Sequence, residues 1–356
     1  MNKMKTSLCT LAILVIAASC SKNDQPPIDP PKVTAGVYAL NEGNFNGNNT
    51  TLTYFNFPSG PAITDVYKNA NGSGLGDTGN DMIVYGGKLY IVMNVSSYVE
   101  VADALSAKSI KKIAMKSTGS EPNPIQPRHI IAYKNKILVS SWDGTVAVID
   151  TASLNIEKSI KVGANPEQMA VYGNNLYVAN SGGITPGYDS TVSVIDLASF
   201  TETSKIVVGK NPTAVTVDAA GNLYVGCTGN YADIGPKLVK INPSTGKIVL
   251  SVDKAVAKLI YYNGMLYATG GYLGAATVQT ISPTDLSVVA SNIVSDGTTI
   301  SIPYALAIDE SNGDVYVGDA VDYASAGKVY CFDKQGKIKF SFSTGTNPNS
   351  IALVKK

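Results

Sequence analysis

The sequence has very few of the side chains on which most enzymes and nucleic-acid-binding proteins depend. Its 356 residues include a single histidine, His129, and a single arginine, Arg128. One histidine excludes a multi-histidine metal site and restricts any Ser-His-Asp triad to His129 itself. One arginine leaves almost no capacity for bidentate recognition of phosphate or guanine. Lyases, metal-dependent hydrolases and nucleic-acid binders are therefore disfavoured.

The chain also lacks an excess of charge of either sign. Lys and Arg together number 28, against 27 for Asp and Glu. Removal of a leader that carries Lys3 and Lys5 would leave 26 basic and 27 acidic residues, a net charge of −1. This balance argues against nucleic acid or an anionic membrane surface as a partner.

Long apolar segments are scarce, and the one near the N-terminus is too short to span a bilayer stably. Lys3 and Lys5 precede the apolar run 11–18, which leads into Ala-Ala-Ser and Cys20. This arrangement resembles a lipobox, so we expect a lipoprotein signal peptide at 1–19 and lipid on Cys20. An ordinary secretory signal with an incidental cysteine is the alternative. Residues 20–35 are polar and rich in proline, which suits a flexible tether, and the lipid is the only membrane attachment that we expect.

Long helical patterns are absent, whereas short β-rich segments alternate with Gly, Asn and Pro clusters. An apolar residue followed by Tyr recurs every 39 to 52 residues, with Ile137-Leu138 as a variant. The repeats are Val37-Tyr38, Leu89-Tyr90, Ile137-Leu138, Leu176-Tyr177, Leu223-Tyr224, Leu266-Tyr267 and Val315-Tyr316. Such spacings are typical of four-stranded propeller blades. We therefore predict an all-β fold, a seven-bladed β-propeller of four-stranded antiparallel blades over residues 36–356.

The repeat that is easiest to read predicts strands at 167–172, 175–180, 191–196 and 203–208. Asn-Pro turns at 163–166, 209–212 and 345–348 separate blades, since proline is tolerated as the first residue of a strand. The propeller begins with a second strand, and Ser350 to Val354 form one more inner-type strand. We expect that strand to complete the first blade and close the ring, which removes an open sheet edge.

Lysine is frequent on the strands predicted to be outermost in their blades. These lysines are Lys111, Lys112, Lys158, Lys161, Lys205, Lys247, Lys337 and Lys339. Charge on a free edge discourages pairing between sheets, so we interpret them as solvated and not as a binding surface. Cys227 and Cys331 fall on different blades, which predicts two buried thiols without a disulfide.

The remaining motifs carry little chemistry. The Gly-x-Gly-x-x-Gly string at 74–79 is not followed by a predicted helix. A dinucleotide-binding site needs that helix, so the string does not predict one. Asp319 and Asp322 could hold calcium together with backbone carbonyls, although two carboxylates are a weak signal. His129 lies in a predicted inner strand, where we expect it to pack near the central channel.

Each predicted loop between a second and a third strand contains an aromatic residue. These loops and the blade-to-blade turns share one face, around the mouth of the channel. The aromatic residues are Phe45, Tyr98, Trp142, Tyr188, Tyr231, Tyr272 and Tyr323, and their polar neighbours are Asn44, Asp143, Asn180, Asn230, Asp319 and Arg128. Tyr and Trp provide rigid contact area with a polar atom, so we predict a face that binds a flat amphipathic ligand or a sugar chain. Alternatively, these rings pack against their own loops.

Two families share features with this chain. The segment Leu176 to Asn180, the strand 191–196 and the Asn-Pro turns resemble the YVTN repeat of YncE-like propellers, over roughly residues 36–356. The lipobox followed by Ser21-Lys22-Asn23-Asp24 is similar to surface-export signals of Bacteroidetes lipoproteins, although that pattern is more acidic. With the Gly76–Asp81 segment before the second blade, the chain resembles the BtuG-type surface lipoproteins, which capture cobalamin for the TonB-dependent transporter BtuB.

The resemblance implies a lipid-anchored outer-membrane protein that faces the cell exterior and is not an enzyme. It further implies cobalamin or another corrinoid as the ligand, no cofactor, and a TonB-dependent transporter of the BtuB type as the partner. No binding residue of that family can be matched to this sequence, so the candidate site depends on loop position alone. A surface glycan-binding or adhesive propeller is the main alternative; a lyase or lactonase and a scaffold of an outer-membrane complex are the others.

Overall fold

The computed structural model describes residues 33–57, 60–117, 122–183, 187–271, 274 and 276–356. The chain separates into two units, Met1–Lys32 and Val33–Lys356, of which the second is described here. The expected signal peptide, Cys20 and Tyr272 lie outside the described residues. Within the described residues, no helix has the length and apolar character needed to cross a membrane.

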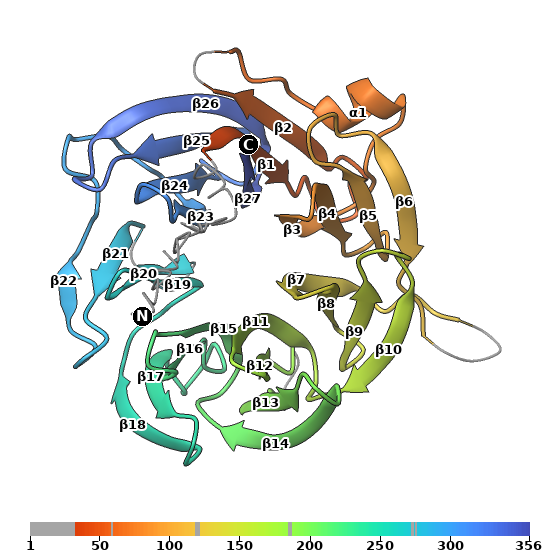
Figure 1. Ribbon diagram of the computed structural model, residues 1–356. Coiled ribbons are helices and arrows are strands. Elements are labelled where there is room, and N and C mark those ends of the chain that lie inside the picture. Colours follow the sequence, from red (N-terminus) through yellow and green to blue (C-terminus); the bar gives the residue numbers. More distant parts are fainter. Residues whose placement is uncertain (1–32, 58–59, 118–121, 184–186, 272–273, 275) are drawn as a thin grey trace, which may run out of the picture. The chain divides into compact units, whose positions relative to one another are not determined.

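Residues Val33–Lys356 form seven antiparallel sheets around a central channel (Figure 1). One blade consists of β27 (Pro348–Lys355), β1 (Thr34–Asn41) and β2 (Thr51–Asn56). Each of the other six contains four consecutive strands. Their bounds are β3 (Gly79–Tyr85), β4 (Lys88–Met93), β5 (Tyr98–Asp103) and β6 (Ser109–Ala114); β7 (Pro127–Tyr133), β8 (Lys136–Ser141), β9 (Thr145–Asp150) and β10 (Ile156–Lys161); β11 (Pro166–Tyr172), β12 (Asn175–Asn180), β13 (Thr191–Asp196) and β14 (Thr201–Val207); β15 (Pro212–Val217), β16 (Leu223–Cys227), β17 (Lys237–Asn242) and β18 (Lys247–Val252); β19 (Lys258–Tyr262), β20 (Met265–Thr269), β21 (Val278–Ile281) and β22 (Val288–Ala290); and β23 (Pro303–Asp309), β24 (Asp314–Asp319), β25 (Ala326–Phe332) and β26 (Ile338–Thr346). The predicted seven-bladed all-β propeller is confirmed.

The recurring apolar-Tyr pair lies on the second strand of each blade, where both faces of the sheet are covered by neighbouring blades. Five of the six residues of β8 and of β12 are buried, for example. Tyr38, Tyr90, Tyr224 and Tyr316 are among the largest fully buried side chains. The repeat therefore reflects packing between blades, because a large ring fills the space between two sheets.

The ring closes as predicted, through the C-terminal strand. β1 pairs with β2 on one side and with β27 on the other, and Tyr38 lies opposite Ala352. Ala352 and Val354 pack in the same apolar cluster as Tyr38 and Leu40. Three strands of this closing blade are described. Beyond β2, the described residues form an isolated bridge between Tyr54 and Ile63 and then the short helix α1 (Val66–Asn71).

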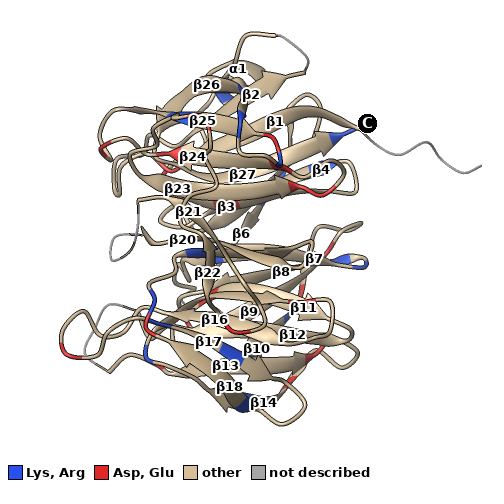
Figure 2. Cartoon of the chain, turned by 90° about the vertical axis from the view of Figure 1, so that its left-hand side faces the viewer, with Lys and Arg blue, Asp and Glu red and all other residues tan. Residues whose placement is uncertain are grey.

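The outer strands and the two cysteines also behave as predicted. β6, β10, β14, β18 and β26 each lie at the edge of a sheet and carry the lysines expected there, except that Lys337 directly precedes β26. Basic and acidic residue positions are interspersed along the strands and loops drawn in Figure 2. Cys227 and Cys331 are free buried thiols on different blades, and burial raises the pKa of each to about 12.

The innermost strands β3, β7, β11, β15, β19, β23 and β27 surround the channel and contact one another in that order (Figure 1). Several begin at a proline that follows a residue with positive φ, as in Asn165-Pro166 and Asn211-Pro212. Asparagine tolerates this left-handed conformation, and proline suits the first position of a strand. The turns thus start each inner strand at the same end of the channel.

Candidate functional site

A cavity of about 560 Å³ opens at the end of the channel where the inner strands begin. Its lining comes from the first residues of inner strands, from blade-to-blade turns and from loops between second and third strands. A second cavity of about 400 Å³ lies along the inner strands. The two share His129, Gln168, Lys258 and Asn349, so together they form a continuous path from the mouth into the channel.

Every blade contributes one polar side chain to this cavity from the same position of its inner strand. That position is the second residue of six inner strands and the first residue assigned to β19. We call this set the mouth ring; in blade order it consists of Asn80, Arg128, Glu167, Thr213, Lys258, Tyr304 and Asn349. Because adjacent blades repeat the same geometry, equivalent positions face one another around the opening.

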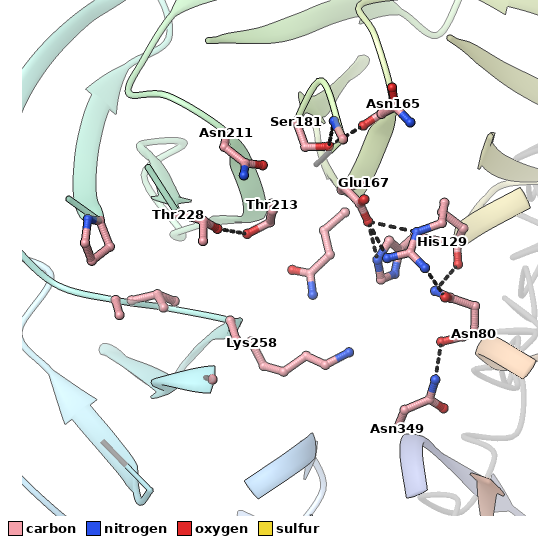
Figure 3. A pocket seen from close by; sticks show the side chains of 18 of the residues that line it. Asn80, His129, Asn165, Glu167, Ser181, Asn211, Thr213, Thr228, Lys258 and Asn349 are labelled. Atoms are coloured by element: carbon pink, nitrogen blue, oxygen red, sulfur yellow. Dashed lines mark hydrogen bonds and ion pairs between the residues drawn. The ribbon is translucent and has the colours of Figure 1, made fainter. Parts of the chain in front are cut away.

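Four consecutive members of the mouth ring are joined by hydrogen bonds (Figure 3). The Asn349 amide donates to the carbonyl oxygens of Gly79 (2.9 Å) and Asn80 (3.2 Å). The Asn80 amide donates to the Arg128 carbonyl at 2.7 Å, and the Arg128 guanidinium donates back to the Asn80 side chain. Arg128 also donates to one Glu167 oxygen from Nε (3.1 Å) and Nη2 (2.9 Å). These contacts connect four blades without any shared strand.

Glu167 is the acceptor at the centre of this network. Its Oε1 accepts from Trp142 Nε1 at 3.1 Å. Its Oε2, which accepts from Arg128, also lies 3.4 Å from His129 Nε2. The Arg128 guanidinium stacks over the Trp142 ring, 4.7 Å from its centroid. Burial alone would raise the pKa of Glu167, but the Arg128 charge and the His129 hydrogen bond outweigh it and lower that pKa to about 2.

His129 packs beside the channel, as expected, between two carboxylates. Its Nδ1 lies 3.0 Å from Asp81 Oδ2, on the inner strand of the neighbouring blade. Asp81 also accepts from the Ser350 hydroxyl (2.9 Å) and from the backbone N–H groups of Met82 and Ile130. Burial opposes ionisation of Asp81, yet the hydrogen bond and charge of His129 lower its pKa overall. The imidazole is thereby held in one orientation.

The remaining three members of the mouth ring do not continue the chain of hydrogen bonds. The Thr213 hydroxyl pairs within its own blade with Thr228 at 3.2 Å. The Tyr304 hydroxyl donates to Glu42 at 2.6 Å. Lys258 lies between them, and its side chain forms no hydrogen bond or ion pair with the described part of the chain. Figure 3 shows this side chain extending into the opening.

The structure brings five of the predicted site residues together at the mouth. Trp142, Tyr231 and Arg128 line the cavity. Tyr188 packs against Tyr231, with ring centroids 6.1 Å apart, and Tyr323 makes an edge contact at 5.6 Å with Tyr304 of the mouth ring. Aromatic rings from four blades therefore border the opening.

Two predicted ligand-binding residues instead stabilise the blades. Asn180 is fully buried at the end of β12. Its side-chain Nδ2 donates to the hydroxyls of Thr191 and Ser193, and its Oδ1 accepts from the backbone N–H of Gly163. Tyr98 begins β5, donates to the Leu75 carbonyl and packs against an apolar cluster between blades. Neither is among the residues that line the cavity.

The other predicted polar and aromatic positions lie away from the cavity and bond within their own loops. Phe45 is 65% exposed, Asp143 accepts from the Thr145 hydroxyl at 2.7 Å, and the Asn230 side chain bonds to Asp233, Ala232 and Ile234. Asn44 uses its backbone N–H to bind Asn49.

The carboxylates considered for calcium are occupied by neighbouring backbone N–H groups. Asp319 accepts from Ser301, Ile302 and Val321, and Asp322 from Ala324 and Ser325. Across the described ranges, no group of three His, Cys, Asp or Glu residues is arranged to hold a metal ion.

Most of the mouth ring was not predicted as part of a site. Asn80, Glu167, Lys258 and Asn349 lie in inner strands, whereas the predicted site residues lie mostly in the loops between second and third strands. A signal was present, because polar residues recur directly after the residue that starts each inner strand, in Pro-Arg128, Pro-Glu167, Pro-Thr213, Pro-Tyr304 and Pro-Asn349.

Comparisons with known proteins support the fold and one family. The structure of hydrazine synthase from Kuenenia stuttgartiensis is 17% identical with a TM-score of 0.61, over 77% of this chain and 89% of that one. A quinonprotein alcohol dehydrogenase-like protein from Bacteroides thetaiotaomicron is 16% identical with a TM-score of 0.63, over 90% and 79%. The computationally designed protein Ika8 is 13% identical with a TM-score of 0.57, over 91% and 97%.

At these identities the structural likeness shows the propeller fold alone. No curated protein matches the sequence. The family model described as "Domain of unknown function (DUF5074)" matches residues 35–336, which is most of the propeller. The chain therefore belongs to the DUF5074 family.

Proposed function

We propose that this protein captures a corrinoid such as cobalamin at the mouth of its propeller, as a lipid-anchored surface protein and not as an enzyme. The observation that carries the proposal is the composition of the mouth cavity. Aromatic rings line it together with amide and hydroxyl groups of the mouth ring and of the turns between blades. A ligand suited to this site needs a broad apolar face together with many hydrogen-bonding groups.

A corrinoid has both features, because a flat macrocycle is surrounded by amide side chains. Trp142 and Tyr231 offer ring faces for apolar contact. Asn165, Asn211 and Gln168 place side-chain amides in the same cavity. A corrinoid is larger than 560 Å³, so part of the ligand would enter the cavity and the rest would cover the rim beside Tyr188 and Tyr323.

The site is held in place before any ligand arrives, which favours tight binding. Trp142 is fixed by a hydrogen bond to Glu167 and by the guanidinium of Arg128. The turn asparagines are held by backbone contacts, since Thr228 N–H donates to the Asn211 carbonyl at 2.8 Å and Ser181 to that of Asn165.

Calorimetry and gel filtration with cyanocobalamin test the proposal, with absorbance at visible wavelengths reporting co-elution. We expect one site per chain, weakened roughly ten- to thirtyfold by Tyr231→Ala, since a buried aromatic contact contributes about 2 kcal/mol. Tyr231 is the cleaner probe because Trp142→Ala would also remove a hydrogen bond to Glu167.

Tyr172→Ala is the matched control. Tyr172 is 41% exposed against 53% for Tyr231, and it lies at the opposite end of the inner strand β11 from Glu167. We expect unchanged affinity for this variant. Absence of both heat and co-eluting colour would refute the corrinoid proposal. Binding of an oligosaccharide under the same conditions would then favour a surface glycan-binding protein, which could use the same rings and amides.

The location and the partner are part of the same proposal. Cys20 would carry the lipid, the propeller would face outward from the outer membrane, and the ligand would pass to a TonB-dependent transporter of the BtuB type. Protease added to intact cells should digest the propeller, and Cys20→Ala should release the protein or leave it as precursor. Full protection of the wild-type protein would place it on the periplasmic side instead.

A further inference from the structure

The mouth ring is closed by hydrogen bonds over four blades and open over the other three. Asn349, Asn80, Arg128 and Glu167 are joined to one another by hydrogen bonds, whereas Lys258 presents an ammonium group to the cavity without a partner among the described residues. Lys258 also borders both cavities, so it lies where the mouth cavity meets the cavity along the inner strands.

The carboxylates near Lys258 are committed elsewhere. Both oxygens of Glu167 accept from Arg128 or Trp142, both oxygens of Asp81 accept hydrogen bonds, and Glu42 accepts from Tyr304. None of the three forms an ion pair with Lys258. Burial lowers the pKa of the Lys258 ammonium group, and the charges of these carboxylates oppose that shift from a distance. An unpaired ammonium inside a protein loses hydration without compensation, which is unfavourable unless a ligand supplies the partner.

We propose that Lys258 is the subsite for a singly charged phosphodiester group of the ligand. The proposal rests on the corrinoid function above, because the nucleotide loop of cobalamin carries one such group. A single positive charge matches a monoanion, whereas the neighbouring carboxylates would repel a dianion. Beside Lys258 the wall is formed by Ala255, Val256, Ala257, Gly270 and Gly271, which leaves room for a bulky organic substituent next to the anion.

The test compares Lys258→Met with Lys254→Met in binding two corrinoids. Methionine keeps an unbranched apolar stem and removes the charge. Lys254 bonds to Gln279 at 3.0 Å and does not line the cavity, so it serves as the matched control. Cyanocobalamin contains the phosphodiester and dicyanocobinamide lacks it. We expect Lys258→Met to weaken cyanocobalamin about tenfold or more and to leave dicyanocobinamide within twofold, with no effect from Lys254→Met.

Equal weakening of both corrinoids, or no weakening of cyanocobalamin, would overturn the assignment. If wild-type protein binds neither corrinoid, the proposed function fails, and dimethyl phosphate then tests the subsite independently. At constant ionic strength, dimethyl phosphate should raise the melting temperature of the wild type and leave that of Lys258→Met unchanged. The same response in both proteins, or none in either, would refute an anion subsite.

The stability of Lys258→Met without ligand separates binding from a structural role. Loss of an unpaired charge from the channel should leave the melting temperature equal to that of the wild type or higher, as often occurs when a functional residue is replaced. A melting temperature lower by several degrees would assign Lys258 to the stability of the ring and would contradict the proposal.

Discussion

The inner and outer strands of the same blades use charged residues in opposite ways. On the inner strands β7 and β11, Arg128 and Glu167 are 2.9 Å apart, and the Glu167 side chain is only 9% exposed. On the outer strand β14, Lys205 and Glu202 are 3.7 Å apart with side chains 38% and 25% exposed. The inner pair joins two blades, whereas the outer pair lies within one strand.

This difference shows that position in the blade decides what a charge contributes. Near the channel, few water molecules screen the interaction, and removal of one partner leaves a buried charge unpaired. At the outer edge, salt and water screen the pair, which therefore adds little stability but keeps the edge from pairing with other sheets. Substitutions in the inner strands should accordingly change the free energy of unfolding more than substitutions in the outer strands.

Removal of a whole inner strand should have the largest effect. Deletion of Asn347–Lys356 takes away β27, so β1 loses one of its two pairing partners and the ring opens between the first and last blades. We expect loss of a single cooperative unfolding transition, measured by thermal circular dichroism.

Deletion of Lys356 alone is the control for this experiment. It removes two backbone hydrogen bonds to Val33 and leaves β27 intact, so the transition should remain cooperative. A ten-residue truncation that melts like the full chain would show that the closing strand is dispensable.

Replacement of one inner charge should have a smaller, pH-dependent effect. The pKa of Glu167 is lowered from 4.5 to about 2 in the folded protein, so its carboxylate stabilises the fold above its unfolded pKa. That contribution, about 3 kcal/mol, is lost as the pH falls from about 5 to 2. Glu167→Gln should lower the free energy of unfolding at pH 7 by about 3 kcal/mol. Below pH 5, the free energy of unfolding of this variant should fall less steeply with pH than that of the wild type, as measured by urea titration.

The outer-strand variant Lys205→Ala completes the comparison with the smallest effect. Its ion pair is half-exposed, so we expect a change in unfolding free energy of less than about 0.5 kcal/mol and an unchanged pH profile. If Lys205→Ala destabilised the protein as much as Glu167→Gln, the distinction between inner and outer strands would be wrong.

The repeat allowed the fold to be predicted closely. The strands expected at 175–180 and 191–196 coincide with β12 and β13, and the pairing of Ser350 with the first blade was expected from the order of strands. These features depend on local alternation of apolar residues and on turn residues, which a single sequence displays directly.

The site was harder to predict because it depends on how far each side chain reaches into the channel. Trp142 and Tyr231 were predicted from their loop position, whereas Asn180 and Tyr98 were placed in equivalent loops but belong to the ends of strands β12 and β5. The mouth ring joins residues that are about forty positions apart, such as Arg128 and Glu167, which are 39 residues apart. Their contact arises from the curvature of the whole ring, so it cannot be predicted from any short segment of the sequence.

Closure by β27 also determines when the protein can finish folding. Tyr38 pairs across the sheet with Ala352, 314 residues later in the chain. At the usual rate of synthesis, roughly 15 to 60 s separate the appearance of these two residues. During that interval β1 and β2 have an unpaired edge, while the later blades can each form from consecutive strands. The first blade is therefore completed only after the last strand has been synthesised, so the closed ring forms after the other blades can already have folded.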